Sequence, residues 1–324
     1  DQNANRRYDG PSELGLLSTS SGGTSTTVDP NLKSPYADEF DLSGERQFWG
    51  ESSVRVAYVR KNTYNDFAAI NVAREGQFTV PTSVTVDIRD FVGGVTGRQT
   101  FQVMDIPAGL PVRNVITNVP DGNYQYDTLQ FAFNKRFGSG LFIQSSFDYQ
   151  WRDELRGGAA STTGSTATLV APSGSPLNSD PITVGYFQNV YPSVSNRQES
   201  TNWQGRAIAR YVFKYDIGVA SNLRMQSGYA FSRIIAVSLP NAGATRFFSQ
   251  DISNDRSDTV PILDLRIDKS FRVGKYRFTG MFDAFNLTNS DAVTNFNLIN
   301  GASYNQVIAA LDPRTLQFGL RFDF

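Results

Sequence analysis

The sequence RTLQFGLRFDF, residues 314–324, alternates strictly between apolar side chains and polar or small ones. Successive side chains of a β-strand point to opposite faces, so a period of two predicts a strand with one apolar face. Large apolar groups are seldom left at a chain end, which usually frays. We therefore expect something other than water to cover this face. Its five side chains are those of Leu316, Phe318, Leu320, Phe322 and Phe324.

The composition of the chain excludes several classes of function. Its 324 residues include no Cys and no His, which removes disulfides, thiolate chemistry and the side chain best suited to proton transfer near neutral pH. A formal net charge of −1 does not favour nucleic-acid binding. Aromatic residues make up 13% of a chain whose mean hydropathy is only −0.33. That combination is typical of a membrane β-barrel, with apolar side chains outside and polar ones inside.

The same alternation recurs in runs of about ten residues, the length that a tilted membrane-spanning strand needs. Short turns near residues 48–50, 138–140, 216–218 and 273–274 join these runs into hairpins. Between the hairpins lie long polar stretches over residues 62–122, 153–200, 234–258 and 288–312. The pattern predicts strands over residues 36–48, 51–61, 124–137, 141–151, 203–215, 219–231, 259–271, 275–286 and 314–324.

These features predict an all-β fold, a transmembrane antiparallel β-barrel in the outer membrane of a Gram-negative bacterium. Such barrels have short periplasmic turns and longer extracellular loops, which puts the C-terminus of this chain in the periplasm. About nine strands are predicted, whereas bacterial single-chain barrels have even numbers. We therefore interpret residues 36–324 as the C-terminal part of a larger barrel and residues 1–35 as the end of an extracellular loop. The first strands and a plug domain would precede Asp1, or the missing strands would come from a second chain.

The end of the chain resembles that of TonB-dependent outer-membrane receptors. The segments that carry the resemblance are LDLRIDKSFRVGKYRFTGMFDAFNLTNSDAV, residues 263–293, and the terminal RTLQFGLRFDF. They combine an alternating strand, a short turn, a strand ending in FNLTN, a long loop and a last strand ending in Phe. VDPNLKSPYADEFDLSGERQF, residues 28–48, is similar to the Oar-like subgroup, whose N-terminal extension is carboxypeptidase-regulatory-like.

The resemblance implies a 22-stranded barrel closed by an N-terminal plug, of which this chain would supply strands 14–22. It also implies energised uptake of a scarce large nutrient such as a siderophore, glycan or peptide. The partners to expect are outer-membrane lipid, the barrel-assembly machinery, the TonB complex through a region upstream of Asp1, and other outer-membrane or surface proteins. No nucleic-acid partner is expected.

Two groups of residues have specific roles in this interpretation. The resemblance implies that Leu316, Phe318, Leu320, Phe322 and Phe324 form a recognition signal for the barrel-assembly machinery; an ordinary amphipathic edge strand is the plainer alternative. Aromatic residues near strand ends predict the two interfacial girdles of a membrane barrel, although scattered packing or carbohydrate stacking also places aromatics there. The girdle candidates are Trp49, Trp151, Trp203, Tyr149, Tyr215 and Tyr276. Of these, Trp151 and Trp203 would mark the outer rim, and Trp49, Tyr215 and Tyr276 the inner one.

The charged residues do not form a recognisable active site. Asp251, Asp255 and Asp258 offer hard oxygen ligands of the kind that Ca²⁺ prefers, but the Gly and distal Glu of an EF-hand loop are absent. A solvated loop is the plainer interpretation. No nucleophile and base stand together, so we expect neither an enzyme nor a cofactor. Mixed charges on the polar faces are expected to line a wet interior: Arg206, Arg210, Lys214, Arg224, Asp264, Arg266, Asp268, Arg321 and Asp323.

Two other functions remain open from the sequence. One is a non-transporting outer-membrane barrel that acts as an adhesin or assembly scaffold through its long surface loops. The other is an extracellular β-rich enzyme or lectin, which would stay soluble and monomeric without detergent.

Overall fold

The computed structural model describes residues 26–48, 50–90, 94–120, 122–138, 140–155 and 190–324. Regular structure in these residues is almost entirely β-strand. The helical segments described are two single 3₁₀ turns, η2 (Lys214–Asp216) and η3 (Ile252–Asn254). Within this part of the chain, no helix is long and apolar enough to cross a membrane. The all-β class predicted from the alternation is confirmed.

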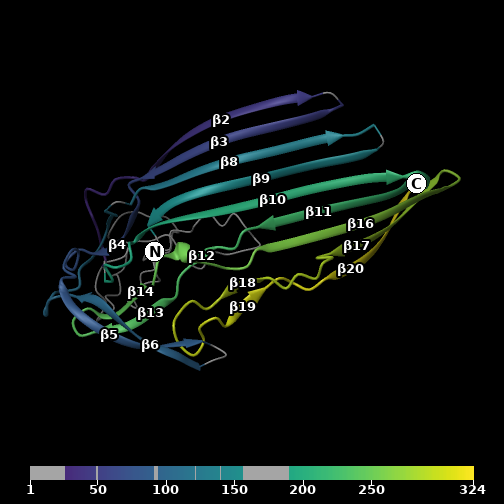
Figure 1. The fold of residues 1–324 in the computed structure, drawn as a ribbon. Coiled ribbons are helices and arrows are strands. Elements are labelled where there is room, and N and C mark those ends of the chain that lie inside the picture. The colour runs from purple at the N-terminus through teal and green to yellow at the C-terminus, as the bar shows by residue number, and fades with distance from the viewer. Residues whose placement is uncertain (1–25, 49, 91–93, 121, 139, 156–189) are drawn as a thin grey trace, which may run out of the picture.

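Nine strands form one sheet in which every neighbour is antiparallel (Figure 1). In spatial order they are β2 (Tyr36–Phe48), β3 (Ser52–Tyr64), β8 (Tyr124–Arg136), β9 (Leu141–Leu155), β10 (Arg197–Phe213), β11 (Ile217–Gln226), β16 (Val260–Val273), β17 (Tyr276–Phe285) and β20 (Thr315–Asp323). These are the nine strands that the alternation predicts. The order along the sheet follows the order along the chain, as successive hairpins require.

The two largest differences from the predicted boundaries lie at the start of β10 and the end of β11, and each has a local cause. Strand β10 begins at Arg197 because its first residues continue the ladder with the end of β9, where Arg197 is paired with Leu155. Strand β11 ends at Gln226, because the chain then leaves the sheet at Gly228 to cross over Ser257. A Cβ atom on Gly228 would collide with the backbone of Ser257, so this crossing requires glycine.

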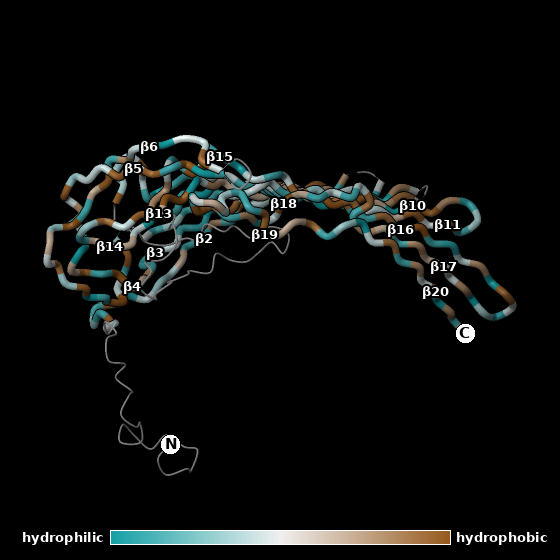
Figure 2. Tube along the Cα trace, turned by 90° about the horizontal axis from the view of Figure 1, so that it is seen from below, coloured by the Kyte–Doolittle hydropathy of each residue, from teal (hydrophilic) through white to brown (hydrophobic). Residues whose placement is uncertain are grey.

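The two ends of the sheet differ in character, and Figures 1 and 2 show them well separated. At one end, which we call the turn end, short hairpin connections join β2 to β3, β8 to β9, β10 to β11, and β16 to β17. The C-terminus lies at this end (Figure 1). The other end, which we call the loop end, contains the described parts of the long polar stretches. Among the described strands, β2 has only β3 as a partner and β20 only β17, so the sheet is open at both edges.

The long polar stretches are not structureless in the part described, which corrects the expectation of plain loops. They contain β4 (Phe67–Asn71) and β7 (Asn114–Asn118), which form a small sheet with β1 (Thr27–Val28), and the hairpin β5 (Val80–Asp90) with β6 (Gly94–Asp105). They also contain β15 (Asp255–Arg256), which pairs with β12 (Ala230–Phe231), the hairpin β13 (Ile234–Leu239) with β14 (Gly243–Phe248), and β18 (Val293–Phe296) paired with β19 (Val307–Ala310).

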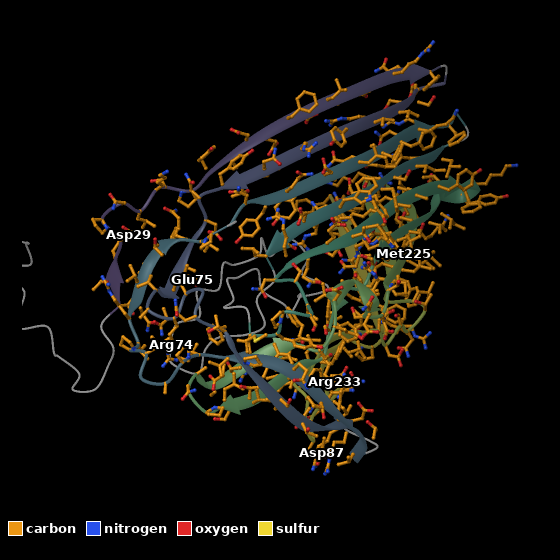
Figure 3. All side chains as sticks on the ribbon, turned by 60° about the vertical axis from the view of Figure 1, so that its left-hand side comes forward. Asp29, Arg74, Glu75, Asp87, Met225 and Arg233 are labelled. Carbon is orange, nitrogen blue, oxygen red and sulfur yellow. The ribbon has the colours of Figure 1, made fainter. Side chains whose placement is uncertain are left out.

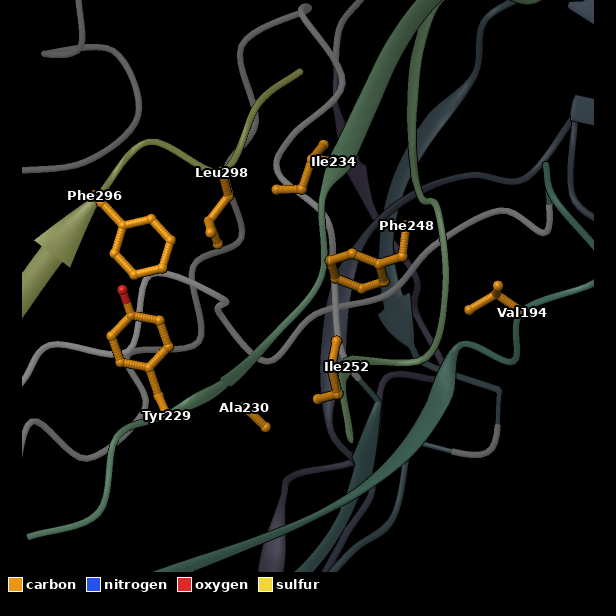
Figure 4. Packing of buried hydrophobic residues seen from close by; sticks show 8 residues of the cluster. All are labelled: Val194, Tyr229, Ala230, Ile234, Phe248, Ile252, Phe296 and Leu298. Atoms are coloured by element: carbon orange, nitrogen blue, oxygen red, sulfur yellow. The ribbon is translucent and has the colours of Figure 1, made fainter. Parts of the chain in front are cut away.

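The main hydrophobic clusters lie among these loop-end elements. One joins residues from β12, β13, β14 and the segments around them (Figure 4): Val194, Tyr229, Ala230, Ile234, Phe248, Ile252, Phe296 and Leu298. A second joins Phe101 and Val103 of β6 to Ile235, Leu239 and Phe247 of the β13–β14 hairpin. Segments far apart in the sequence therefore fold together at the loop end and bury apolar surface there.

Two sets of polar contacts connect these hairpins to neighbouring segments, one at the buried Asp105 and one at the partly buried Arg233. The carboxylate of Asp105 accepts hydrogen bonds from the backbone N–H groups of Ile106, Asn241 and Ala242, at 2.8–2.9 Å. The guanidinium of Arg233, labelled in Figure 3, donates to the carbonyl oxygen of Arg89 and to Asn300. Hydrogen bonds from charged groups to fixed partners are among the stronger ones in proteins, so the loop end is a defined structure.

Candidate functional site

The register of the sheet separates an apolar face from a polar wall. Directly paired residues point to the same side of a sheet. One such row across β11, β16, β17 and β20 is apolar: Val219, Ile267, Phe282 and Phe318. The next row, on the opposite side, is mainly polar: Ala220, Arg266, Asp283 and Gln317. Figure 2 shows the resulting alternation of hydropathy along β16, β17 and β20.

Strand β20 carries the most exposed part of the apolar face. Phe318 is 80% exposed and Phe324 is 95% exposed. Leu316, Leu320 and Phe322 share this face and are exposed as well. Contiguous exposed apolar surface of this kind marks a contact with a membrane or another protein. An apolar side chain at every second residue of a strand is the pattern of a barrel strand whose outer face lies in the lipid hydrocarbon.

The terminal residues proposed as an assembly signal also pack against β17. The ring centroids of Phe282 and Phe318 lie 5.0 Å apart, and those of Phe278 and Phe322 lie 4.9 Å apart. Phe324 continues the series, with its ring 5.9 Å from that of Phe322. The five residues therefore form one aromatic and aliphatic stripe down to the turn end. Their recognition by the assembly machinery stays a prediction.

The predicted girdle residues fall at the two ends of the apolar face. Trp203 is paired with Tyr149 near the loop end, and Trp151 lies 4.7 Å from Tyr149 by ring centroids. Tyr215, in the η2 turn, and Tyr276, at the start of β17, lie at the turn end. Trp49 lies outside the described residues.

When strand tilt is taken into account, the length of β10 between two aromatic residues of its apolar face is close to the height of the apolar band of an outer-membrane barrel. Trp203 and Phe213 lie on the apolar face of β10, ten residues apart in the sequence. At about 3.3 Å per residue they are separated by about 33 Å along the strand. A tilt of about 40° reduces this to about 25 Å, the height of the apolar band of an outer-membrane barrel.

Sequence reasoning missed one aromatic pair at the loop end. Tyr36 and Tyr64 are register partners at the ends of β2 and β3, and their rings stack with centroids 4.9 Å apart. Both tyrosines belong to the apolar face. Tyrosine at a strand end was the available signal, and this pair would extend the predicted outer girdle to the first strands of the sheet.

The polar wall carries ion pairs between strands. Arg266 of β16 binds Asp283 of β17 through two hydrogen bonds of 2.5 and 2.9 Å. Arg224 of β11 pairs with Asp264 of β16 at 3.0 Å. The register places the predicted lumenal charges of the strands on this wall: Arg206, Arg210, Arg224, Asp264, Arg266, Asp268, Arg321 and Asp323. Lys214 lies in the η2 turn.

One of these ion pairs spans a whole strand. Arg210 of β10 reaches Asp268 of β16 at 3.0 Å across the intervening β11. It crosses at Gly218, which is the register partner of both Val212 and Asp268. A Cβ atom on residue 218 would collide with the carboxylate of Asp268 and the guanidinium of Arg210. The missing side chain of Gly218 thus makes room for this contact.

The aspartates considered for calcium are not gathered into a site. Asp251 accepts a hydrogen bond from Gln198 at 3.2 Å, and Asp255 accepts one from Gln250 at 2.5 Å. No group of three acidic side chains that could hold a metal ion occurs in the described part of the chain. Asp251, Asp255 and Asp258 all lie exposed at the loop end, and the calcium hypothesis gains no support.

Two aspartates at the loop end have pKa values shifted in opposite directions by their surroundings. Burial raises the pKa of Asp66, which is only 4% exposed and accepts hydrogen bonds from the Tyr124 hydroxyl and the backbone N–H of Phe67. In contrast, a hydrogen bond from Arg98 at 3.0 Å lowers the pKa of Asp87. The buried Asp66 fixes the point where the chain leaves β3 and enters β4.

Comparison with known proteins agrees with this geometry. A family model described as an outer membrane beta barrel domain matches residues 3–181, more than half of the chain. No curated protein and no solved structure matches the chain. An open antiparallel sheet with an apolar face, aromatic residues at both ends of that face and a charged opposite wall is what this family leads one to expect. The chain therefore belongs to the outer membrane beta barrel domain family.

Proposed function

We propose that this chain is the C-terminal part of the barrel of a TonB-dependent outer-membrane transporter. The observation that carries the proposal is the nine-stranded sheet, open at both edges, whose polar wall is lined by ion pairs. Backbone groups left unpaired in hydrocarbon cost several kcal/mol each. Strands β2 and β20 therefore need further partners before the apolar face can lie in a membrane.

The direction of the strands constrains what completes the barrel. Because every neighbouring pair among the nine is antiparallel, β2 and β20 run in the same direction. An odd number of additional strands would join them through antiparallel pairs only. A barrel with nine strands in one part of its wall and more in the rest is wide, and wide barrels enclose a channel or a plugged lumen. The resemblance of residues 263–293 and 314–324 to TonB-dependent receptors favours the plugged form, with thirteen strands added to give 22.

The two ends of the sheet support an orientation. Outer-membrane barrels have short turns on the periplasmic side and long loops outside. The turn end, with Phe324, then faces the periplasm, and the folded loop end faces the medium, where a substrate would first be met. The ion-paired wall would face the plug and the passing substrate.

Genetic separation of uptake from energy supply tests the proposal. Strains lacking this gene, the TonB energising complex or both would each receive radiolabelled ferric siderophore, oligosaccharide and peptide as separate probes. We expect uptake of one probe to fall equally in both single mutants and no further in the double mutant. Unchanged uptake of every probe on loss of this gene would refute the proposal.

The folded loop end favours a second candidate function, that of a surface adhesin or assembly scaffold. Hairpins β5–β6 and β13–β14 are held together by a buried cluster and by Asp105, so they present a fixed outer surface. Adhesion should then be lost when this gene is deleted and retained when only the TonB complex is deleted. This result would favour the adhesin or scaffold function over transport.

A further inference from the structure

The FNLTN segment, residues 285–289, joins β17 to the loop that precedes the last strand. Asn286 and Asn289 both adopt left-handed backbone conformations, with φ values of 50° and 52°. Asparagine tolerates this conformation better than other residues with a side chain. Between them the N–H of Asn289 donates to the carbonyl oxygen of Asn286 at 2.8 Å, which closes a tight turn.

The side chain of Asn286 links the beginning and the end of the following loop. This residue is only 7% exposed. Its amide nitrogen donates to the carbonyl oxygens of Ser290, at 2.8 Å, and of Asp312, at 2.9 Å. Its amide oxygen accepts from the N–H of Ser290 at 2.9 Å. A single buried amide thus holds Asp312 beside the end of β17.

Asn289 and the backbone make further contacts to the same two places. The side-chain oxygen of Asn289 accepts from the N–H of Arg314 at 2.9 Å, and the guanidinium of Arg314 donates to the carbonyl oxygen of Leu287. On the other side, the N–H of Asn286 donates to the Asp264 carboxylate, and the N–H of Leu287 donates to the carbonyl oxygen of Leu263. The segment is therefore bound both to β16 and to the residue that precedes β20.

We propose that Asn286 and Asn289 form a register lock that aligns the last strand, β20, on β17. The first ladder pair of these strands is Phe285 with Thr315, and the lock holds the residues immediately beyond that pair. The two ends of the intervening loop, which contains β18 and β19, are then held together next to the first residue pair of the β17–β20 ladder. Pairing β20 with β17 becomes as local as closing a short hairpin, instead of requiring the ends of a long loop to meet.

The lock matters because register decides which side chains face lipid. A slip of one residue would turn the apolar stripe of β20 inward and its polar residues outward. A slip of two residues would keep the faces but misalign Phe318 from Phe282 and Phe322 from Phe278. This inference concerns assembly of the barrel and does not depend on the transport proposed above.

Engineered cysteines report the register directly, because the chain contains no native cysteine. In the full-length protein in isolated outer membranes, Thr279→Cys with Arg321→Cys reports the native register, in which these residues are partners. Thr279→Cys with Gly319→Cys or with Asp323→Cys reports a shift of two residues in either direction. After mild oxidation, mass spectrometry of the digested, membrane-inserted fraction gives the ratio of shifted to native cross-links.

We expect Asn286→Ala combined with Asn289→Ala to raise this ratio at least fivefold. Asn305→Ala is the matched control, since Asn305 also has a left-handed backbone, with φ of 63°, but lies exposed and outside the lock. Glycine at both positions keeps the backbone conformation and removes the amides, so it should raise the ratio as alanine does. A parental ratio with glycine would show that backbone conformation alone sets the register and would overturn the proposal.

The proposal can still be tested if the double variant fails to insert into the outer membrane. Asn289 is exposed, so Asn289→Ala alone leaves the buried amide of Asn286 in place and should still insert. We expect it to raise the shifted-to-native ratio about twofold. An unchanged ratio in Asn289→Ala and in every inserted variant at residue 286 would refute the lock.

Discussion

Placing an arginine on the apolar face of β20 tests whether that face lies in lipid. Phe318 is 80% exposed and is the register partner of Phe282. Phe282 lies six residues from Tyr276 at the turn end, about 20 Å along the strand. With a tilt of about 40° this is about 15 Å of depth, close to the middle of an apolar band about 25 Å high.

From this depth we expect Phe318→Arg to reduce the free energy of unfolding by about 2–4 kcal/mol, the cost of arginine near the bilayer midplane. Phe322→Arg lies about 5 Å from the girdle by the same estimate and should cost about 0–1 kcal/mol. Gln317→Arg is the matched control, because Gln317 is adjacent in sequence but faces the polar wall. It should be close to neutral.

The assay is urea unfolding of the full-length protein in lipid vesicles, followed by tryptophan fluorescence. The informative quantity is the difference between variants, since each carries the same added charge. Equal losses for Phe318→Arg and Gln317→Arg would show that the two faces do not have different surroundings. Equal losses for Phe318→Arg and Phe322→Arg would contradict the proposed membrane depth.

Three further predictions concern other parts of the molecule. Deleting Phe324 should lower the amount of heat-modifiable protein in outer membranes, and an unchanged amount would argue against an assembly signal at the terminus. Gly218→Ala should separate Arg210 from Asp268 and, through overpacking, lower the free energy of unfolding by about 1–3 kcal/mol. Urea unfolding measures this loss. Gly280→Ala is the matched control, because nothing lies near a Cβ atom at that glycine, and an equal loss in both variants would contradict the explanation. Because burial raises the pKa of Asp66, the folded state favours its protonated form. Stability from this residue is therefore fully present below the ordinary aspartate pKa of about 4 and is lost as pH rises through the raised folded value; Asp66→Asn should remove that loss, and parallel pH profiles for the two proteins would contradict it.

Much of the sheet was predictable because its physical cause is periodic in the sequence. In a strand with lipid on one side and water on the other, apolar and polar residues must alternate. Runs such as residues 314–324 and 124–137 can therefore be recognised as strands from the sequence alone, without knowing which strands lie beside them. Glycine and polar residues between the runs identified the hairpin turns. Turn length then predicted which strands are adjacent.

The loop end was not predicted, although part of the signal was present. Residues 80–90 alternate Val80, Thr82, Val84, Val86 and Ile88 on one side, but the run lies inside a long polar stretch that was expected to be plain loop. Val84, Val86 and Ile88 pack, partly buried, against the cluster that includes the β13–β14 hairpin, about 150 residues further along the chain. Periodicity shows that a face is apolar and does not show which distant segment covers it.

By itself, the sequence determined the class of fold, the strands of the sheet and the face of each strand that is apolar, because alternation is a local property of the chain. Tertiary structure decided what depends on distances between strands. Arg210 reaches Asp268 only because Gly218 lies between them without a side chain. Asn286 meets Asp312 only because the intervening loop returns to its starting point. Such contacts join residues with no fixed spacing in the sequence, so only the folded chain shows them.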